Sequence, residues 1–155
     1  MEKNAHKVVL ATKYRPDSFK KLLGQGIMVE TIINSIKLNK LPNAWMLSGI
    51  RGVGKTTTAR LIAQAINCKK NFVQGEKCDL QEYCSCKEIS ESKNLDVIEI
   101  DGAQNTGVDS TKELIASCMY APTTAKYKVI IADEFQMLSK SSFAALLKTL
   151  EEPPP

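Results

Sequence analysis

The sequence predicts an α/β fold, a parallel sheet flanked by helices, on three observations. Residues 49–56 read GIRGVGKT, which has the glycine, lysine and hydroxyl spacing of a phosphate-binding loop. A short apolar segment precedes this loop and a helical period follows it, so strand, loop and helix come in order. A second apolar run, at 129–132, ends in two adjacent carboxylates, at the strand end where α/β sheets bind ligands.

Length and composition indicate one compact domain, or a large piece of one, over residues 1–155. The chain is 43% hydrophobic and 25% charged, which suits a buried core and argues against disorder. No apolar run approaches the roughly 18 residues that a membrane span needs. Residues 1–10 lack the apolar stretch of a secretion signal, so we expect a cytoplasmic protein without a membrane partner.

The net charge of +4 is unevenly distributed along the chain. Residues 1–77 hold 14 Lys/Arg against 4 Asp/Glu, whereas residues 78–155 hold 7 against 13. Two interpretations remain open. Either the first half meets an anionic partner, or its basic residues form a solvated face.

The first third of the chain is expected to form an arm and an amphipathic helix. Residues 11–26 have no clean period, and Pro16 favours an extended Arg15, so this segment is predicted to lie across the body of the domain. Residues 27–39 carry apolar side chains at helical spacing. The apolar residues 44–48 are predicted to form a buried strand, and residues 57–67 a helix.

The glycine loop between that strand and that helix is suited to binding phosphate. Its glycines permit conformations and close approaches that a Cβ would obstruct, and the following helix offers unpaired N–H groups to an anion. Lys55 is expected to reach the β- and γ-phosphates, and Thr56 to ligate Mg²⁺. The residues expected to contact nucleotide here are Gly49, Arg51, Gly52, Val53, Gly54, Lys55, Thr56 and Thr57.

Four of the five cysteines lie within residues 68–86. Cysteines of a cytoplasmic chain do not favour a disulfide framework. We predict one Zn²⁺ per chain in this hydrophilic insertion, because zinc fixes a loop that is too polar to pack on its own. The alternative is an insertion of free cysteines that has lost its metal. The predicted ligands are Cys68, Cys78, Cys84 and Cys86, and the fifth cysteine, Cys118, is expected to be a small buried hydrophobe.

The second half of the chain is expected to add two strands and two helices. Leu95 belongs to the apolar alternation of the first of these strands. Thr106 and Asp109 have the spacing of a capping box, and the helix behind them has an apolar edge at Val108, Ile115 and Cys118. The expected elements are a strand at 95–101, a helix after 106, a strand covered on both faces at 127–134 and a helix at 139–152.

The carboxylates at the end of the strand at 127–134 suit phosphoryl chemistry. Asp133 is expected to hold the water shell of the Mg²⁺ that Thr56 ligates. Glu134 is expected to polarise the water that attacks the γ-phosphate. Without the glycine loop, such an acidic pair would more often be a solvated turn.

Taken together, these segments resemble the gamma/tau subunits of the bacterial DNA polymerase III clamp loader, which are AAA+ ATPases. The likeness runs from about residue 10 to residue 155. The motifs that carry it are YRP at 14–16, Phe19, Gly24-Gln25, the glycine loop, the cysteines, Asp133-Glu134 and LLKTLEEPP at 146–154. The resemblance implies a RecA-like P-loop module with a small zinc insertion, forming the N-terminal part of a longer chain.

The resemblance also implies a role in DNA replication. Such a subunit uses ATP within a heteropentameric ring of clamp-loader subunits to place the sliding clamp on primer-template DNA. The family is counted with the DNA-directed DNA polymerase holoenzyme, a nucleotidyltransferase, although this chain has no polymerase active site. Catalytic arginines and a lid residue would come from other subunits or from sequence beyond residue 155, so weak hydrolysis by this chain alone is expected.

Further site residues follow from the resemblance. The arm that packs against adenine in the family corresponds to Ala11, Tyr14, Arg15, Pro16, Leu23 and Gly24. Lys148 matches a basic position that faces template DNA. The chain departs from the family at three points. Gln136 stands where histidine is common, and the cysteine spacing differs. The loop 104–107 is neutral, which weakens the case for DNA phosphate contact there.

Two other functions remain open at this point. One is a non-catalytic, zinc-bearing interaction module of the same complex, whose nucleotide site is structural or empty. The other is an AAA+ ATPase of recombination or repair. The joint presence of Lys55, Thr56, Asp133 and Glu134 disfavours the first, and the cysteines and the ending at 146–154 disfavour the second.

Overall fold

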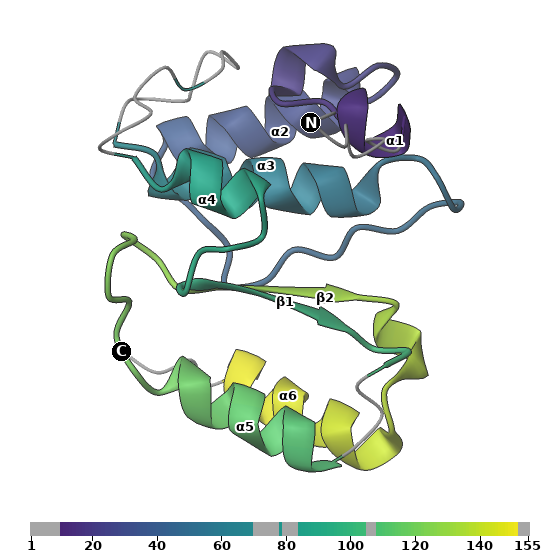
Figure 1. Ribbon diagram of the computed structural model, residues 1–155, viewed down its shortest axis with the longest axis vertical. Helices are drawn as coiled ribbons and strands as arrows, with labels where there is room; N and C mark the ends of the chain where they lie inside the picture. Colours follow the sequence, from purple (N-terminus) through teal and green to yellow (C-terminus); the bar gives the residue numbers. More distant parts are fainter. Residues whose placement is uncertain (1–9, 70–77, 79–83, 105–107, 152–155) are drawn as a thin grey trace, which may run out of the picture.

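Helices cover both faces of a small parallel sheet (Figure 1), so the α/β class is confirmed. The structure, a computed structural model, describes residues 10–69, 78, 84–104 and 108–151. Its elements in chain order are α1 (Leu10–Lys13), η1 (Phe19–Lys21), α2 (Gly26–Lys37), α3 (Lys55–Asn67), α4 (Cys86–Ser90), β1 (Val97–Asp101), α5 (Val108–Cys118), β2 (Val129–Asp133), η3 (Phe135–Met137) and α6 (Lys140–Glu151). Among the described residues, no helix combines the length and apolar character that crossing a membrane requires.

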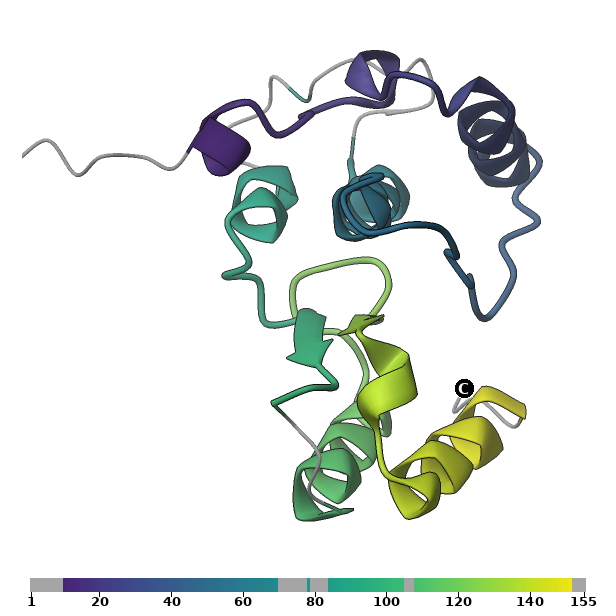
Figure 2. The same ribbon diagram turned by 90° about the vertical axis from the view of Figure 1, so that its right-hand side faces the viewer.

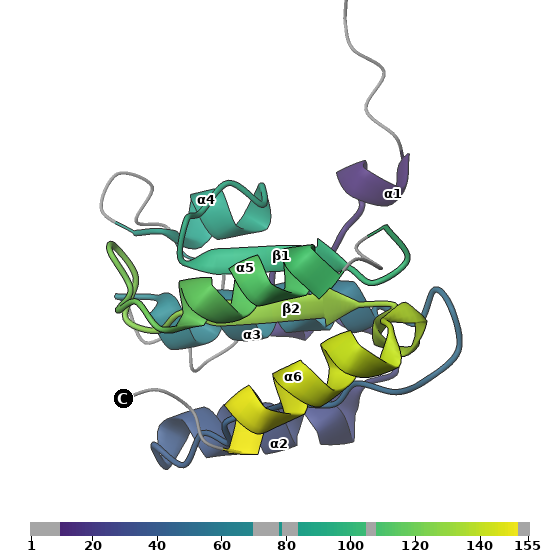
Figure 3. The same ribbon diagram turned by 90° about the horizontal axis from the view of Figure 1, so that it is seen from below.

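The sheet aligns the ends of its two strands. Strands β1 and β2 pair in parallel, with Val97 opposite Val129 and Asp101 opposite Asp133. Helices α2, α3 and α4 lie on one side of the sheet, and α5 and α6 lie on the other (Figures 1 and 2). Seen from below, α5 lies over the strands, while α6 lies beyond β2 on the side away from β1 (Figure 3).

Helix α3 contributes side chains to both clusters of the hydrophobic core. The first cluster lies between η1, α2 and α3 and comprises Phe19, Ile32, Leu61, Ile62 and Ala65. The second lies between α3, α4 and the sheet and comprises Ala63, Ile89, Val97 and Ile131. Because α3 is buried on two sides, its position relative to the sheet is set by packing as well as by the loop that precedes it.

The strand expected at 44–48 is not present. These residues form neither strand nor helix, with Trp45 and Leu47 half-buried and Met46 87% exposed. A strand needs a hydrogen-bonding neighbour, and the sheet in the described part of the chain pairs only β1 with β2. The short apolar run therefore predicted a strand that the described residues do not form.

Three other expectations need correction. Leu95 is 78% exposed and precedes β1, which begins at Val97. On α5 the buried side chains among those described are Thr111 and Leu114, whereas Ile115 and Cys118 are only half-buried. Strand β2 is not covered throughout, since Ala132 is exposed. The capping box expected at 106–109 lies outside the described residues, apart from the backbone of 108 and 109.

Asp96 links the start of β1 to the turn before β2. Its side chain is buried, and its carboxylate accepts backbone N–H bonds from Thr123 (2.8 Å), Thr124 (2.7 Å) and Ala125 (2.8 Å). Its carbonyl oxygen accepts a fourth bond from the Val129 N–H (2.8 Å). Burial raises the pKa of Asp96, but the hydrogen bonds outweigh burial and lower the pKa to about 2. This carboxylate therefore anchors the turn that leads into β2.

We predict that Asp96 makes the free energy of unfolding depend on pH. Because the folded pKa lies below the ordinary value of 3.8, the stabilisation is complete above pH about 4 and is lost as the pH falls to about 2. A shift of this size corresponds to roughly 2 kcal/mol. Urea unfolding of Asp96→Asn should show that loss at pH 7, with a smaller difference from wild type towards pH 2.

A matched control for Asp96→Asn is Glu113→Gln, on the exposed side of α5. It should leave the free energy of unfolding unchanged at both pH values, since exposed charges contribute little. Equal stability of Asp96→Asn and wild type at pH 7 would contradict the role of Asp96.

Candidate functional site

The glycine loop leads directly into the first turn of α3. Gly52 and Gly54 have φ of 84° and 95°, values that favour glycine because it lacks a Cβ. Gly54 occupies the N-cap position of α3, and its carbonyl accepts the N–H of Thr58 at 2.8 Å. Arg51, Gly52 and Val53 are exposed. The loop thus presents the N-terminal end of a 13-residue helix to solvent, as an anion-binding site requires.

The side chain of Lys55 hydrogen-bonds to the glycine loop. Its ammonium Nζ donates to the carbonyl of Gly49 at 2.9 Å and to that of Ile50 at 3.1 Å. These bonds hold the side chain back across the loop. An arriving phosphate would meet this cation beside the N–H groups of the first turn of α3, and would take over the ammonium hydrogen bonds from neutral carbonyls.

Two predicted magnesium ligands lie in direct contact. The hydroxyl of Thr56, in the first turn of α3, donates to the Asp133 carboxylate at the end of β2, with an O–O distance of 2.6 Å. Both side chains are half-buried. A hydroxyl and a carboxylate oxygen are the hard ligands that Mg²⁺ prefers, so this donor pair fits the predicted ion.

Glu134 lies in a tight turn that follows β2. It has φ of 46° and ψ of 40° and is the N-cap of η3. Its own N–H donates to the Asp133 carboxylate at 3.0 Å, and its side chain is exposed and accepts a hydrogen bond from Gln136. A left-handed backbone at a residue other than glycine is sparsely populated and needs support from its surroundings.

Gly102, which follows β1, supplies part of that support. Its N–H donates to the Asp133 carbonyl at 2.8 Å. A Cβ at this position would lie 2.5 Å from the carbonyl oxygen of Glu134. Sequence reasoning missed this residue. The available signal was a glycine directly after a predicted strand, because the carboxyl ends of parallel strands meet at one edge of the sheet, where the acidic pair lies.

The predicted arm meets α3 one turn beyond the glycine loop. A cavity of about 190 Å³ is lined by Arg15, Pro16, Asp17, Thr57, Arg60, Leu61, Gln64 and Ser90. Three residues predicted to contact nucleotide, Arg15, Pro16 and Thr57, therefore lie around one cavity. Tyr14 and Leu23 do not line it and are 73% and 90% exposed. Gly24 adopts φ of 75°, and the side chain of Ala11 lies outside the described residues.

Arg60 holds the same turn of α3 against the sheet. Its guanidinium makes two hydrogen bonds to the Glu99 carboxylate of β1, with Nε at 2.7 Å and the second nitrogen at 2.6 Å. Only 16% and 21% of the two side chains are exposed. Such a two-pronged pair fixes orientation as well as distance. It was not predicted, because nothing in the spacing of residues 60 and 99 indicates contact.

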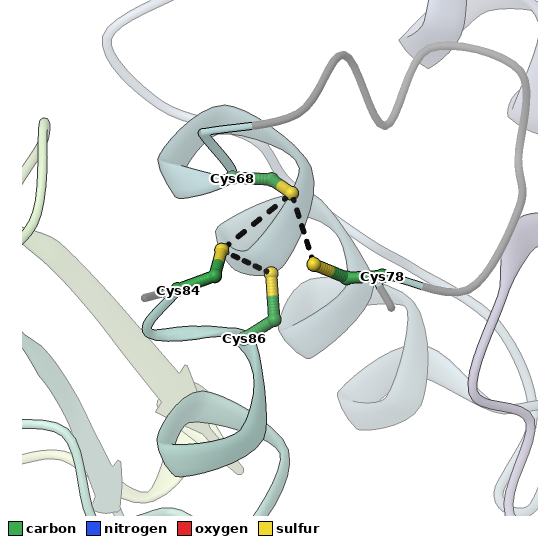
Figure 4. Close-up of side chains that lie close together, drawn as sticks. All are labelled: Cys68, Cys78, Cys84 and Cys86. Atoms are coloured by element: carbon green, nitrogen blue, oxygen red, sulfur yellow. Dashed lines mark hydrogen bonds between the residues drawn. The ribbon is translucent and has the colours of Figure 1, made fainter. Parts of the chain in front are cut away.

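The four predicted cysteine ligands converge (Figure 4). Their sulfurs all lie within 4.8 Å of one another. The Sγ–Sγ distances are 3.6 Å from Cys68 to Cys78, 3.7 Å from Cys68 to Cys84 and 3.3 Å from Cys84 to Cys86. Tetrahedral zinc with Zn–S bonds of about 2.3 Å separates its sulfurs by about 3.8 Å. The donor set and spacing therefore fit a zinc ion.

Two helices end next to the cluster. Cys68 follows the last residue of α3, and Cys86 begins α4. Gln64 of α3 donates to the Cys86 carbonyl at 3.3 Å. Burial raises the pKa of Cys84, yet hydrogen bonds from backbone and neighbouring thiols lower it to about 7. Burial and the adjacent sulfurs raise the pKa of Cys86. The hydrogen bond from Gln64 therefore joins α3 to α4 beside the cluster.

Two remaining predictions have different outcomes. Lys148 belongs to α6, but its side chain lies outside the described residues, so its orientation stays untested. Cys118 is half-buried, and its thiol donates to the Leu114 carbonyl at 3.1 Å. The expectation of a fully buried residue was therefore too strong.

Comparison with known proteins gives consistent matches. A family model described as DNA polymerase III, delta subunit, matches residues 24–155. The DNA polymerase III subunit gamma of Buchnera aphidicola subsp. Schizaphis graminum is 48% identical over 148 residues, which cover 94% of this chain and 39% of that protein. The DNA polymerase III subunit tau of Escherichia coli K12 is 42% identical over 146 residues, which cover 94% of this chain and 22% of that protein. The chain thus spans well under half of the length of these relatives.

We predict that Gly102→Ala disturbs the acidic turn. The added Cβ would overlap the Glu134 carbonyl, so the turn must shift, at a cost of about 1–3 kcal/mol in the free energy of unfolding. Thermal or urea unfolding measures this loss. The matched control is Gly26→Ala at the start of α2, where a Cβ meets nothing within 4 Å. Equal effects of the two substitutions would contradict the close contact at Gly102.

Proposed function

The chain belongs to the family described as DNA polymerase III, delta subunit, and from this we propose that it is an ATP-binding and hydrolysing part of a clamp loader. The single observation that carries the nucleotide site is the hydrogen bond between Thr56 and Asp133. It joins the end of the glycine loop to the acidic end of β2, which is the juxtaposition that Mg·ATP chemistry needs. The names of the gamma and tau relatives support the replication role.

In this proposal the glycine loop binds the phosphates of ATP. Backbone N–H groups of the loop and of the first turn of α3 surround the phosphates, and the Lys55 ammonium moves from the loop carbonyls to the β- and γ-phosphate oxygens. Thr56 would ligate Mg²⁺ and Asp133 would hold its water shell, and the ion would neutralise charge on the phosphates. Arg15, Pro16 and Thr57 form the side of the site away from the phosphates, where the arm crosses α3.

Hydrolysis is assigned to water activated by Glu134. The water oxygen forms a bond to the γ-phosphorus while the bond from that phosphorus to the β–γ bridging oxygen breaks, giving ADP and inorganic phosphate. A proton of the attacking water passes to the Glu134 carboxylate, and the charge that builds on the γ-phosphate is stabilised by Lys55. An arginine from a neighbouring subunit would complete the charge stabilisation, which is why slow turnover is proposed for this chain alone.

The cysteine cluster is proposed to hold one structural Zn²⁺. The four sulfurs would fill all four positions of tetrahedral zinc, which leaves no position for substrate. The ion would join the C-terminal end of α3 to the start of α4. Partners proposed for the whole protein are the other clamp-loader subunits, the sliding clamp and primer-template DNA, with Lys148 of α6 directed towards the DNA.

We predict that Lys55→Ala weakens binding of Mg·ATP by roughly tenfold or more. A hydrogen bond from an ammonium to a charged oxygen contributes about 1.5–3 kcal/mol, and 1.4 kcal/mol corresponds to a factor of ten in affinity. Isothermal titration calorimetry measures the dissociation constant. Lys37→Ala, at an exposed position at the end of α2, is the control and should bind as wild type does. A Lys55→Ala variant with wild-type affinity would indicate a nucleotide site that is structural or empty.

We also predict about one zinc per chain in protein purified without chelator. Elemental analysis should give less than half an equivalent for Cys86→Ser, because three ligands and a serine hydroxyl hold zinc poorly. Cys118→Ser, which lies outside the cluster, should keep the full equivalent. Less than half an equivalent in the wild type would contradict the metal site and would favour the alternative of free cysteines.

A further inference from the structure

The backbone of the acidic turn is held at several points. Gly102 contacts it from β1, as described above, and the Met137 N–H donates to the Glu134 carbonyl at 2.9 Å. The ring of Phe135 packs against that of Phe143 in α6, with centroids 4.9 Å apart. The path of the chain through Glu134 is therefore fixed from both the sheet and α6.

The side chain of Glu134 has much less support. It is exposed, and in the described part of the chain its carboxylate makes one hydrogen bond, from the side-chain amide of Gln136 to Oε2 at 2.5 Å. An exposed glutamate has three rotatable bonds, so a fixed backbone does not fix the position of its carboxylate. Gln136 thus supplies the orientation that the turn itself does not.

We propose that Gln136 is a positioning residue for hydrolysis, which holds the Glu134 carboxylate in the orientation from which it accepts the proton of the attacking water. This inference rests on the proposed function. The geometry that supports it is local: the two residues flank Phe135, whose ring is fixed against α6, so Gln136 is carried on the same rigid turn as the group that it orients.

The chemistry of an amide suits this task. The Gln136 amide donates a hydrogen bond without carrying charge, so it orients Glu134 without drawing away the negative charge that makes the carboxylate a base. An amide also does not titrate near neutral pH, so the contact is the same across that range. A histidine at this position would behave differently, because its ordinary pKa lies near 6.5.

The test compares Gln136→Ala and Gln136→His with wild type in single-turnover hydrolysis of saturating Mg·ATP between pH 6 and 8. Gln136→Ala should lower the rate by about tenfold, as loss of orientation does, with the dissociation constant for ATP changed less than twofold. For Gln136→His, the rate relative to wild type should fall below pH about 6.5, because a protonated imidazole pairs with Glu134 and weakens it as a base.

The chain contains a matched control at the end of the other strand. Gln104 donates to the Asp101 carboxylate at 2.9 Å, so Gln104→Ala removes the same kind of contact outside the proposed chemistry. It should leave the rate and its pH dependence unchanged. A wild-type rate for Gln136→Ala, or an equal loss in Gln104→Ala, would overturn the proposal. So would a Gln136→His variant whose rate relative to wild type does not vary with pH, as a purely structural role predicts.

A second measurement is independent of nucleotide. The side-chain amide ¹⁵N resonance of Gln136 should move towards that of a solvated glutamine in Glu134→Ala, while the resonance of Gln104 stays in place. An unmoved Gln136 resonance would overturn the contact even if ATP is hydrolysed. If the resonance moves but the protein shows no hydrolysis that depends on Lys55, the proposed function is overturned, and the positioning role of Gln136 with it.

Discussion

The hydrogen bond from the Thr56 hydroxyl to the Asp133 carboxylate joins two parts of the chain that are 77 residues apart. The bond joins the end of the glycine loop, which leads into α3, to the last residue of β2, just before the acidic turn. The packing of Ala63 against Ile89, Val97 and Ile131 brings the helix to the sheet, and the Arg60–Glu99 pair sets its orientation. The polar contact at the end of α3 thus depends on apolar and ionic contacts along its length.

Helix α3 connects three of the candidate functional features of the molecule. Its first turn carries Lys55 and Thr56, its next turns line the cavity below the arm, and Cys68 follows its last residue. A helix of 13 residues is about 20 Å long, so the cysteine cluster lies far from the proposed phosphate site and, in our proposal, takes no part in its chemistry. The cluster instead fixes the far end of the helix that presents the loop.

Local patterns in the sequence predicted most helices and strands correctly, but predicted poorly which elements pair or pack with one another. Helical periods located α2, α3 and α6, and the apolar run at 129–132 located β2, because these signals depend on which face of an element is buried. Residues 44–48 read as a strand, but pairing is decided by a partner that no local pattern specifies. The contacts of Asp96, Gly102 and Glu99 join residues 27 to 39 positions apart. No motif in the sequence marks residues at such distances as neighbours.

The contact of Lys55 with the Gly49 and Ile50 carbonyls has a consequence for kinetics. A lysine that waits in solution must lose the freedom of several rotatable bonds when a ligand arrives, at about 0.5–1.5 kcal/mol for such a side chain. Here most of that ordering accompanies folding of the chain. Under the proposed function, capture of a phosphate would then need an exchange of hydrogen-bond acceptors over a short distance, without a prior search among Lys55 rotamers.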